Sequence, residues 1–436
     1  MHEIIFLLLT VYFVISTLFF TLNLKYGLAP DEDYHYRVSM AYSETPLIPE
    51  NSVDSYTYGD ITRIPYLFFW INGRIANLNF TDLSDFRLLR LVNLVYSIFT
   101  VLFTYKLSKE LIKDKWLQLV PTVFLVNTLM FVYLSGAINY DNLVNLCSVA
   151  SLFYLVNFLK KHKRRDLLLW SFFIACGSLT KYTFLPIAFA QFLLVFVEIR
   201  YINIKKHFFN MSVVEYFLTG VVFILLLLNL NVYGVNLYRY SAVTPSCNQV
   251  LEYEDCLNNQ PFRRNDSYEY VELASKEGMK EILQTRDSPY EYTANWMMSM
   301  ANGIYGILGH ESFKPLRWAI SNYVIYFITI TLIIVRKFKL SRSKINSALF
   351  VTIFYSLILL FYQNYRSYLK HGVQEVALQG RYIFPVLGLI YIISIAYIEK
   401  VQNRVLKYSL VIWGIWLFIL GSFPLIVDQL PRSWFR

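Results

Sequence analysis

Charged residues are scarce in this sequence. Asp, Glu, Lys and Arg make up only 16% of the 436 residues, whereas 56% of the residues are hydrophobic. A soluble domain of this length could not bury so much apolar surface, so the composition excludes an ordinary soluble globular protein. Clusters of basic residues with interleaved aromatic residues are also lacking, and we therefore expect no nucleic-acid partner.

Cysteine and histidine are also rare, with four and six residues. Their spacing matches no zinc site, and we predict neither a bound metal nor a cofactor. Cys147 and Cys176 fall inside apolar segments, but Cys247 and Cys256 lie in polar sequence nine positions apart. In an oxidising compartment these two would form a disulfide, Cys247–Cys256; the alternative is a pair of free thiols.

Long apolar segments, by contrast, are abundant, and they predict an all-α polytopic integral membrane protein. About eleven segments are long enough, or nearly so, to cross a bilayer as helices. They cover residues 4–24, 89–105, 117–134, 143–159, 167–180, 184–199, 212–232, 319–335, 346–363, 382–398 and 408–427. No long repeat, low-complexity tract or flexible linker interrupts this pattern, so we expect a single transmembrane domain over residues 1–436.

The distribution of basic residues predicts the orientation of the chain. Half of the 40 Lys and Arg residues lie in five short connections, 106–116, 160–166, 200–211, 336–345 and 399–407. By the positive-inside rule, these connections and the N-terminus face the cytoplasm. Two long loops, 25–88 and 233–318, then lie on the extracytoplasmic face, together with the shorter 135–142 and 364–381.

Each long loop contains a pattern that predicts a helix lying in the membrane surface. In the first loop, Ile61 to Ile75 is apolar and rich in aromatic residues but too short to cross the bilayer. In the second loop, Trp296, Met300, Ile304 and Leu308 recur at intervals of four, which places them on one helix face.

Three consecutive carboxylates, Asp31, Glu32 and Asp33, follow the first apolar segment, where a membrane helix meets water. His35 and Arg37 lie within about one helical turn of them. One interpretation is a helix start with Asp31 as the N-cap residue. The other is a reactive acid that a lipid-borne substrate can reach. Spacing alone does not separate the two interpretations.

Three further charged residues lie at the same predicted face. Asp141 directly precedes the fourth apolar segment, as an N-cap or as a functional acid. Lys181 interrupts apolar sequence, where a charge costs about 2.5 to 3.5 kcal/mol at mid-bilayer, so we expect a partner for it unless it snorkels to the interface. Arg381 presents a planar fork suited to phosphate; the alternative is a structural pair with Glu375 or another loop acid.

Several short motifs occur in the order found in one family of membrane enzymes. They read Pro30-Asp31-Glu32-x-x-His35-Tyr36, Ile64-Pro-Tyr-Leu-Phe-Phe-Trp70, Phe86-Arg-Leu-Leu-Arg-Leu-Val92, Ile138-Asn-Tyr-Asp141, Leu179-Thr-Lys-Tyr182 and Gln379-Gly-Arg-Tyr-Ile-Phe-Pro385. With these motifs the chain resembles the GT-C superfamily of glycosyltransferases that use polyprenyl-phosphate sugars, most closely its DUF2142-like and PMT/ArnT-like bacterial branch. The likeness runs through most of the membrane region and depends on the ordered set of motifs.

The resemblance implies a GT-C-like fold and an enzyme of the bacterial inner membrane. Such an enzyme moves a hexosyl or pentosyl group from a polyprenyl-phosphate donor to a glycan, lipid or protein acceptor on the extracytoplasmic face. Asp31 would act as the base, Glu32 would orient the acceptor or the cations, and Arg381 and Lys181 would stabilise the phosphate leaving group. The remaining expected substrate-binding residues are His35, Arg37, Asp141, Tyr182, Gln379 and Tyr382.

Two other classes of function fit a polytopic membrane protein of this size. A transporter or flippase for a lipid-linked saccharide would keep ionisable groups near the bilayer midplane and show repeated halves, whereas here the acids lie at helix mouths and the halves do not match. A polymerase or ligase that joins whole oligosaccharides would use similar chemistry but form longer products. A non-catalytic membrane scaffold is a further alternative.

Overall fold

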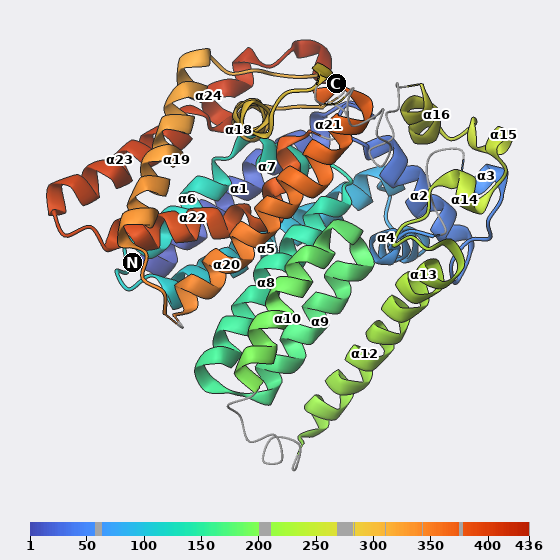
Figure 1. Ribbon diagram of the computed structural model, residues 1–436, viewed down its shortest axis with the longest axis horizontal. Coiled ribbons are helices and arrows are strands. Elements are labelled where there is room, and N and C mark those ends of the chain that lie inside the picture. Colours follow the sequence, from blue (N-terminus) through green and yellow to red (C-terminus); the bar gives the residue numbers. More distant parts are fainter. Residues whose placement is uncertain are drawn as a thin grey trace.

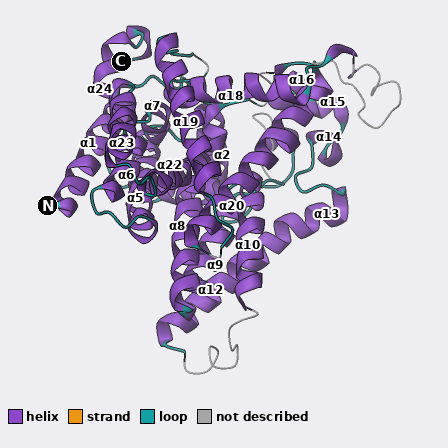
Figure 2. Cartoon of the chain, turned by 60° about the vertical axis from the view of Figure 1, so that its left-hand side comes forward, coloured by secondary structure: helices purple, strands orange, loops and turns teal. Residues whose placement is uncertain are grey.

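The computed structural model describes residues 1–56, 63–199, 211–267, 282, 284–309, 311–341, 343–374 and 378–435. Within these ranges the chain is helical, with no strands beyond two isolated β-bridges, Leu24 with Phe435 and Ile307 with Phe313. The all-α prediction is therefore confirmed. Figure 1 shows the helices as one bundle with shorter elements gathered at its upper side, and Figure 2 shows the same arrangement from another direction.

Seven helical stretches in the described ranges are long and apolar enough to cross a membrane, so the chain is an integral membrane protein. They are α1 (His2–Asn23), α5 (Asp85–Leu111), α8 (Tyr140–Lys161), α12 with its continuation into α13 (Val213–Tyr240), α19 (Arg317–Lys337), α20 with its continuation into α21 (Lys344–His371), and Gly380–Glu399, which contains α22 (Phe384–Glu399).

Two bent pairs of helices raise the count of candidate spans to nine if each pair is one span. In the first, Leu117–Val126, which includes α6 (Val120–Val126), meets α7 (Leu129–Ser135) at 64°. In the second, α23 (Arg404–Leu420) meets Phe423–Gln429, which includes α24 (Phe423–Ile426), at 49°.

The predicted number of eleven spans is not confirmed. The two other expected segments form α9 (Arg164–Thr180) and α10 (Leu185–Ile199), with 17 and 15 residues. Both are short because the chain leaves the helical conformation at Lys181, which has extended backbone angles between them.

Helix α8 lies at the centre of the bundle, between α5, α9 and α22. Its most apolar window is 83% buried, compared with 28% for α1 and 11% for α12. Lipid-facing helices therefore surround α8, whose N-terminal end is held inside the protein. Because successive helices run in alternating directions, the connections that contain residues 24–31, 136–139, 181 and 378–381 meet at the same end of the bundle.

Short helices cover this end of the bundle. Helix α2 (Glu32–Glu44) packs against α4 (Leu67–Asn77), which corresponds to the predicted first surface helix; residues 61 and 62 of that segment lie outside the described ranges. Helix α18 (Pro289–Tyr305) contains three of the four residues of the second predicted face, and Leu308 follows its end. A capping box of Ser288 and Glu291 begins α18.

The 233–318 loop also contains α14 (Cys247–Val250), α15 (Tyr253–Cys256) and α16 (Gln260–Asp266). Cys247 and Cys256 form the predicted disulfide, with a Cα–Cα distance of 5.7 Å. Helix α15 contacts α3 (Val53–Tyr56) of the first loop. The disulfide thus stabilises a small unit that joins the two long loops.

Candidate active site

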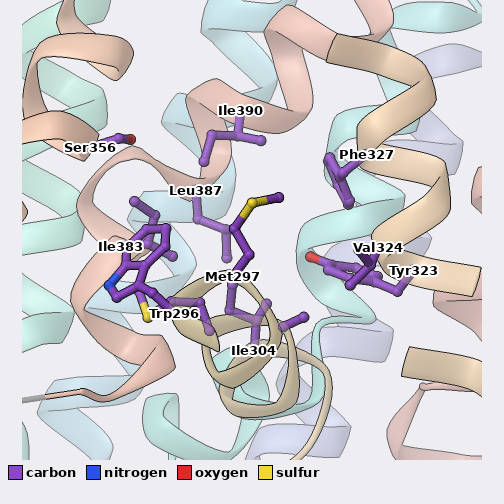
Figure 3. A pocket seen from close by; sticks show the side chains of 12 residues that line it. Trp296, Met297, Ile304, Tyr323, Val324, Phe327, Ser356, Ile383, Leu387 and Ile390 are labelled. Carbon is purple, nitrogen blue, oxygen red and sulfur yellow. The ribbon is translucent and has the colours of Figure 1, made fainter. Parts of the chain in front are cut away.

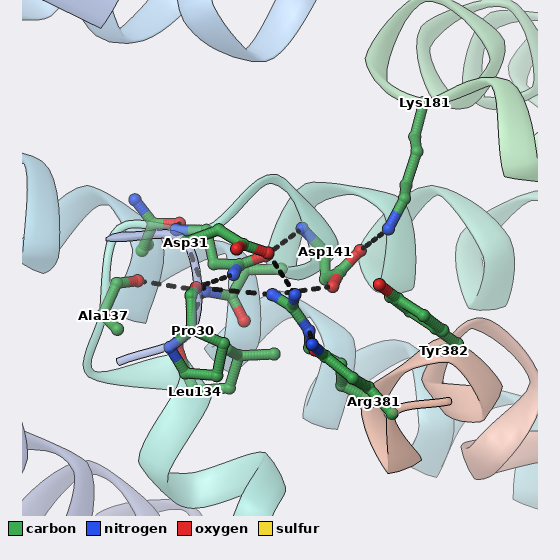
Figure 4. Close-up of polar contacts among 12 residues, drawn as sticks. Pro30, Asp31, Leu134, Ala137, Asp141, Lys181, Arg381 and Tyr382 are labelled. Atoms are coloured by element: carbon green, nitrogen blue, oxygen red, sulfur yellow. Dashed lines mark hydrogen bonds and ion pairs between the residues drawn. The ribbon is translucent and has the colours of Figure 1, made fainter. Parts of the chain in front are cut away.

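Four charged side chains from distant parts of the sequence meet at this end of the bundle (Figure 4). Arg381 Nη2 donates a hydrogen bond to Asp31 Oδ2, and Arg381 Nη1 lies 3.7 Å from Asp141 Oδ2. Lys181 Nζ lies 2.7 Å from Asp141 Oδ1. We call Asp31, Asp141, Lys181 and Arg381 the charge quartet. The sequence had predicted all four as functional residues, and the fold brings them together.

The charge quartet is balanced in charge but uneven in burial. The side chain of Arg381 is 0% exposed, that of Asp141 2% and that of Lys181 9%, whereas the side chain of Asp31 is 44% exposed. Two acids and two cations leave no net charge buried, which makes the cluster tolerable inside the protein. Asp31 is therefore the member of the quartet that substrate can approach most directly.

The backbone of Asp31 has an unusual conformation, with φ of 57° in the left-handed region. Asp31 occupies the N-cap position of α2, but its side chain makes no capping hydrogen bond. The N-cap interpretation is thus wrong for the carboxylate, which turns to Arg381 instead. Burial raises the pKa of Asp31, but the positive charges of Arg381 and Lys181 outweigh this effect and hold its pKa below the usual range.

The loop before Asp31 is fixed from several directions. The carbonyl oxygen of Pro30 accepts hydrogen bonds from Asn139 Nδ2 at 3.0 Å and from Arg381 Nη1 at 3.4 Å. Gly309 passes so close that a Cβ there would lie 3.3 Å from Pro30. Farther back, Lys25 N donates to Trp434 O at 2.9 Å. These contacts hold Asp31 in its left-handed conformation beside Arg381.

The indole of Trp434 is buried next to this loop. It is 1% exposed and donates a hydrogen bond from Nε1 to the carboxylate of Glu311. The neighbouring Phe435 packs against Phe19 and Phe20 of α1. The segment around Trp434 thereby forms part of the wall behind the charge quartet.

Glu32 points away from the charge quartet. Its side chain is 0% exposed, and both oxygens accept from Arg90, Oε1 from Nε and Oε2 from Nη2, each at 2.7 Å. Ile138 N also donates to Oε1, at 3.1 Å. The carboxylate of Glu32 thus contacts Arg90 and Ile138 instead of the cations of the quartet, and the role expected of it toward the acceptor stays a prediction.

Arg90 is a residue whose role the sequence analysis missed. Its Nη1 donates to the carbonyl oxygens of Leu24 at 2.8 Å and Thr21 at 3.2 Å, at the end of α1. Through Glu32, Arg90 ties α1 and α5 to the start of α2. The available signal was its position inside an apolar segment, where a charge needs a buried partner.

His35 and Arg37 lie outside the charge quartet. His35 is fully buried with its ring 4.3 Å from that of Tyr140, and its two nitrogens have no hydrogen-bond partner among the described residues. Burial lowers the pKa of His35 to about 3, so it is neutral at physiological pH. Arg37 Nε lies 2.8 Å from Asp33 Oδ1 in an exposed ion pair. His35 thus packs against Tyr140 and Arg37 pairs with Asp33, and the substrate-binding roles expected of both residues stay predictions.

Aromatic and amide side chains complete the quartet's surroundings. Lys181 Nζ lies 4.2 Å from the ring centre of Tyr140 and 5.0 Å from that of Tyr382, which are cation–π distances. Gln379 Oε1 accepts from Arg381 Nε at 2.6 Å. Tyr182 is 42% exposed, directly after Lys181. Tyr382 and Gln379 thus contact the quartet, and Tyr140 forms a further part of its wall.

An apolar cavity of about 240 Å³ lies between α18, α19 and α22 (Figure 3). Helix α18 contributes Trp296 and Met300, α19 contributes Phe327, and α22 contributes Leu387. Ile383, two residues after Arg381, also lines the cavity. The short element Gly380–Ile383 therefore contributes both to the cavity, through Ile383, and to the quartet, through Arg381. The described residues contain no group of His, Cys, Asp or Glu side chains that could hold a metal ion.

Two glycines allow α18 to lie directly against the segment that contains Arg381. A Cβ on Gly303 would come within 2.7 Å of the backbone nitrogen of Gly380. A larger residue at either position would push the cavity wall and Arg381 apart. The contact explains how the cavity and the quartet remain adjacent.

Parts of the sequence and the fold resemble known proteins. Residues 64–228 match the family model described as dolichyl-phosphate-mannose-protein mannosyltransferase. Among solved structures, ArnT from Cupriavidus metallidurans bound to undecaprenyl phosphate superposes with a TM-score of 0.52 and 13% identity over 91% of this chain. The chain has the GT-C fold. The GT-C resemblance predicted from the ordered motifs is thereby confirmed.

The chain described here covers 61% of the length of that ArnT chain. The apo structure of the same ArnT matches over 90% of this chain and 78% of its own, at 12% identity and a TM-score of 0.33. No curated protein matches the sequence.

Proposed function

We propose that this protein transfers a sugar from a polyprenyl-phosphate donor to an acceptor at the charge quartet. The observation that carries the proposal is the half-exposed acid Asp31 beside two buried cations, with an apolar cavity next to them. The family model and the likeness to ArnT bound to undecaprenyl phosphate support the same class of donor.

In the proposed reaction the acceptor oxygen attacks the anomeric carbon of the donor sugar. Asp31 takes the proton of the acceptor hydroxyl, and the bond between the anomeric carbon and the phosphate oxygen breaks. The electron pair leaves with the polyprenyl phosphate, whose developing charge Arg381 and Lys181 stabilise. A charge pair about 4 Å apart, at an effective dielectric near 20, contributes about 4 kcal/mol before desolvation. The attack from the face opposite the phosphate gives inversion.

The polyprenyl chain has a matching place in the apolar cavity. We propose that the isoprene units nearest the phosphate enter between α18, α19 and α22. Because the chain comes from bilayer hydrocarbon rather than from water, the cavity would orient the donor through packing contacts and not through hydrophobic transfer. Leu387→Trp would fill the cavity, and we expect it to raise the KM for a long-chain donor more than for a short-chain analogue.

We also propose that the quartet faces the extracytoplasmic side of a bacterial inner membrane, with the N-terminus in the cytoplasm. Among the described residues, the Lys- and Arg-rich connections 106–116, 160–166 and 399–407 lie at the opposite end of the bundle from the quartet, which agrees with the positive-inside rule. The disulfide Cys247–Cys256 lies at the quartet's end, and disulfides form in oxidising compartments. The acceptor class, glycan, lipid or protein, stays open.

The test is transfer of radiolabelled sugar from a synthetic polyprenyl-phosphate donor to endogenous acceptors in membranes that contain the protein. We expect transfer by the wild type, near-complete loss in Asp31→Asn and normal transfer in Asp33→Asn, which changes charge two residues away. Normal turnover by Asp31→Asn would contradict the role of Asp31 as base. Movement of the labelled lipid across the bilayer without a covalent product would indicate a flippase instead, and products growing by repeat units would indicate a polymerase.

A further inference from the structure

The cations expected to bind the donor phosphate are already occupied. Arg381 donates from Nη2 to Asp31, from Nη1 to the carbonyl oxygen of Pro30 and from Nε to Gln379. Lys181 is paired with Asp141 at 2.7 Å. Because the side chains of Arg381 and Lys181 are 0% and 9% exposed, a phosphate oxygen reaches the arm of Arg381 that faces Asp31 most directly by replacing the acceptor already bound there.

Asp31 is the acceptor best able to move. Pro30 contributes a main-chain carbonyl that Asn139 also holds, and Asp141 is 2% exposed and fixed between two cations. The carboxylate of Asp31 is 44% exposed, and within the described part of the chain Arg381 is its one hydrogen-bond partner. A rotation of the Asp31 side chain into solvent would vacate one arm of the guanidinium fork without breaking any other contact.

The carboxylate of Asp31 also resembles the phosphate that would replace it on Arg381. Carboxylates and phosphates both present oxygens that bind the donors of a guanidinium fork, so one can replace the other on the same nitrogen atoms. The charges match too, because a sugar phosphodiester carries one negative charge, as does the carboxylate that it replaces.

We infer that the Asp31 carboxylate occupies the phosphate site on Arg381 in the free protein and that the donor phosphate displaces it. This inference rests on the proposed function and specifies how binding of the donor controls the transfer reaction. While Asp31 is bound to Arg381, the adjacent positive charge holds the pKa of its carboxylate below the usual range and makes it a weak base. Displacement by the donor removes this direct contact, so donor binding precedes full activation of the acceptor, and a bare acceptor meets a less reactive site.

Asp141 keeps the two cations together during the exchange. Its Oδ1 holds Lys181, while Oδ2 has no hydrogen-bond partner in the described ranges and lies 3.7 Å from Arg381 Nη1. When Asp31 leaves, Oδ2 can tighten onto Arg381 and hold the guanidinium in place under the phosphate. Asp141 is thus a positioning residue in this scheme.

The test measures binding of undecaprenyl phosphate, without sugar or acceptor, to the purified full-length protein in nanodiscs. If Asp31 is bound to Arg381 nine-tenths of the time in the free protein, the phosphate site is open for only about a tenth of the time. Removing the charge of Asp31 then tightens phosphate binding about tenfold. We therefore expect Asp31→Asn to bind undecaprenyl phosphate about tenfold more tightly than the wild type. We expect the same gain in Asp31→Ser, which serves if Asp31→Asn does not fold.

Two controls separate displacement from a general loss of negative charge. Asp33→Asn removes the same charge two residues away from a carboxylate that does not contact Arg381, and its affinity should stay within about twofold of the wild type. Uncharged undecaprenol should bind equally to wild type and Asp31→Asn. Arg381→Gln should weaken phosphate binding in both the wild-type and the Asp31→Asn background.

Equal or weaker binding of undecaprenyl phosphate by both Asp31 variants would overturn the inference, as would an equal gain in Asp33→Asn. The proposed function fails on a different measurement, normal sugar transfer by Asp31→Asn. A variant that has lost transfer but gained no affinity would therefore contradict the displacement and leave Asp31 as the base.

Discussion

Asp31 and Glu32 are neighbours in the sequence, and each bonds to a buried arginine, but the two ion pairs differ in every other respect. Glu32 and Arg90 are 0% and 2% exposed, and they meet through two parallel hydrogen bonds. Asp31 is 44% exposed and bonds to one arm of Arg381. A closed, dry pair stabilises the fold, whereas an acid with one open side can exchange its partner.

Local geometry explains why adjacent acids have such different environments. Asp31 has left-handed backbone angles, while Glu32 begins α2 in the right-handed helix. Their side chains therefore leave the backbone in different directions, one toward η6 (Gly380–Ile383) and the other toward α5. A single residue in an uncommon conformation thus separates a structural acid from a reactive one.

The largest loss of stability should come from breaking the buried Glu32–Arg90 pair. Arg90→Gln leaves Glu32 buried without its partner, and we expect the protein to lose about 3 to 5 kcal/mol of stability. The measurement is the unfolding midpoint of the purified protein in detergent. Arg87→Gln, an exposed arginine on the same helix, is the matched control. If the two variants unfold alike, the Glu32–Arg90 pair does not hold the fold as we describe.

Loss of the half-exposed Asp31–Arg381 pair should lower the rate of sugar transfer more than the stability of the fold. Arg381→Gln removes a cation from the developing phosphate charge, and we expect kcat for sugar transfer to fall about 100- to 1,000-fold. Lys181 still neutralises Asp141 in this variant, so the unfolding midpoint should change much less than in Arg90→Gln. Arg366→Gln, at an exposed arginine, controls for loss of one positive charge. Equal destabilisation by Arg381→Gln and Arg90→Gln would remove the distinction between the pairs.

His35, one turn after Glu32, should make a smaller and pH-dependent contribution. Its pKa is about 3 in the folded protein and about 6.5 in an unfolded chain, so between these values only the unfolded chain takes up the proton. Stability therefore falls as pH falls below 6.5, by about 2 kcal/mol between pH 7 and pH 5. We expect His35→Phe to lose less stability than the wild type over this range, measured as unfolding midpoints at both pH values. An identical pH dependence would mean that His35 is not buried as a neutral ring.

The smallest effect should come from the exposed pair on the other side of α2. Arg37 and Asp33 are 44% and 40% exposed, so solvent screens their attraction. We expect Arg37→Gln to change stability by less than about 1 kcal/mol and the rate of transfer by less than about twofold. Initial rates with the labelled donor provide the measurement. A large loss of transfer would restore Arg37 to the substrate-binding role that the sequence suggested.

The sequence was sufficient to predict which charged residues lie at the same face of the membrane. Lys181 and Arg381 lie at the ends of apolar segments, where an unpaired charge is costly, so each required an acid nearby. Acids at such positions were few, and Asp31 and Asp141 lay at ends of the chain's predicted spans on the same face. Charge scarcity therefore indicated a shared site, whereas the individual pairs, Lys181 with Asp141 and Arg381 with Asp31, follow only from the packing.

The sequence could not assign the direction of each side chain. Capping of α8 comes from Asn139, whose side chain accepts from Asp141 N at 2.9 Å, so Asp141 is left to bind Lys181. Glu32 could not be separated from Asp31, because that choice depends on one left-handed residue and on Arg90 of α5. The apolar run 117–134 gave no sign of its 64° bend, since hydropathy does not record where helical hydrogen bonds end.

The buried position of Trp434 has a practical consequence for preparing the protein. Its main chain bonds to Lys25 and its indole to Glu311, so the last residues are tied to the loop that leads to Asp31. An affinity tag fused directly after Arg436 would disturb these contacts of Trp434 with Lys25 and Glu311. A low rate of sugar transfer in such a preparation would then be an effect of the tag. Met1 is 75% exposed at the opposite end of α1, which makes a fusion there the better choice for purification.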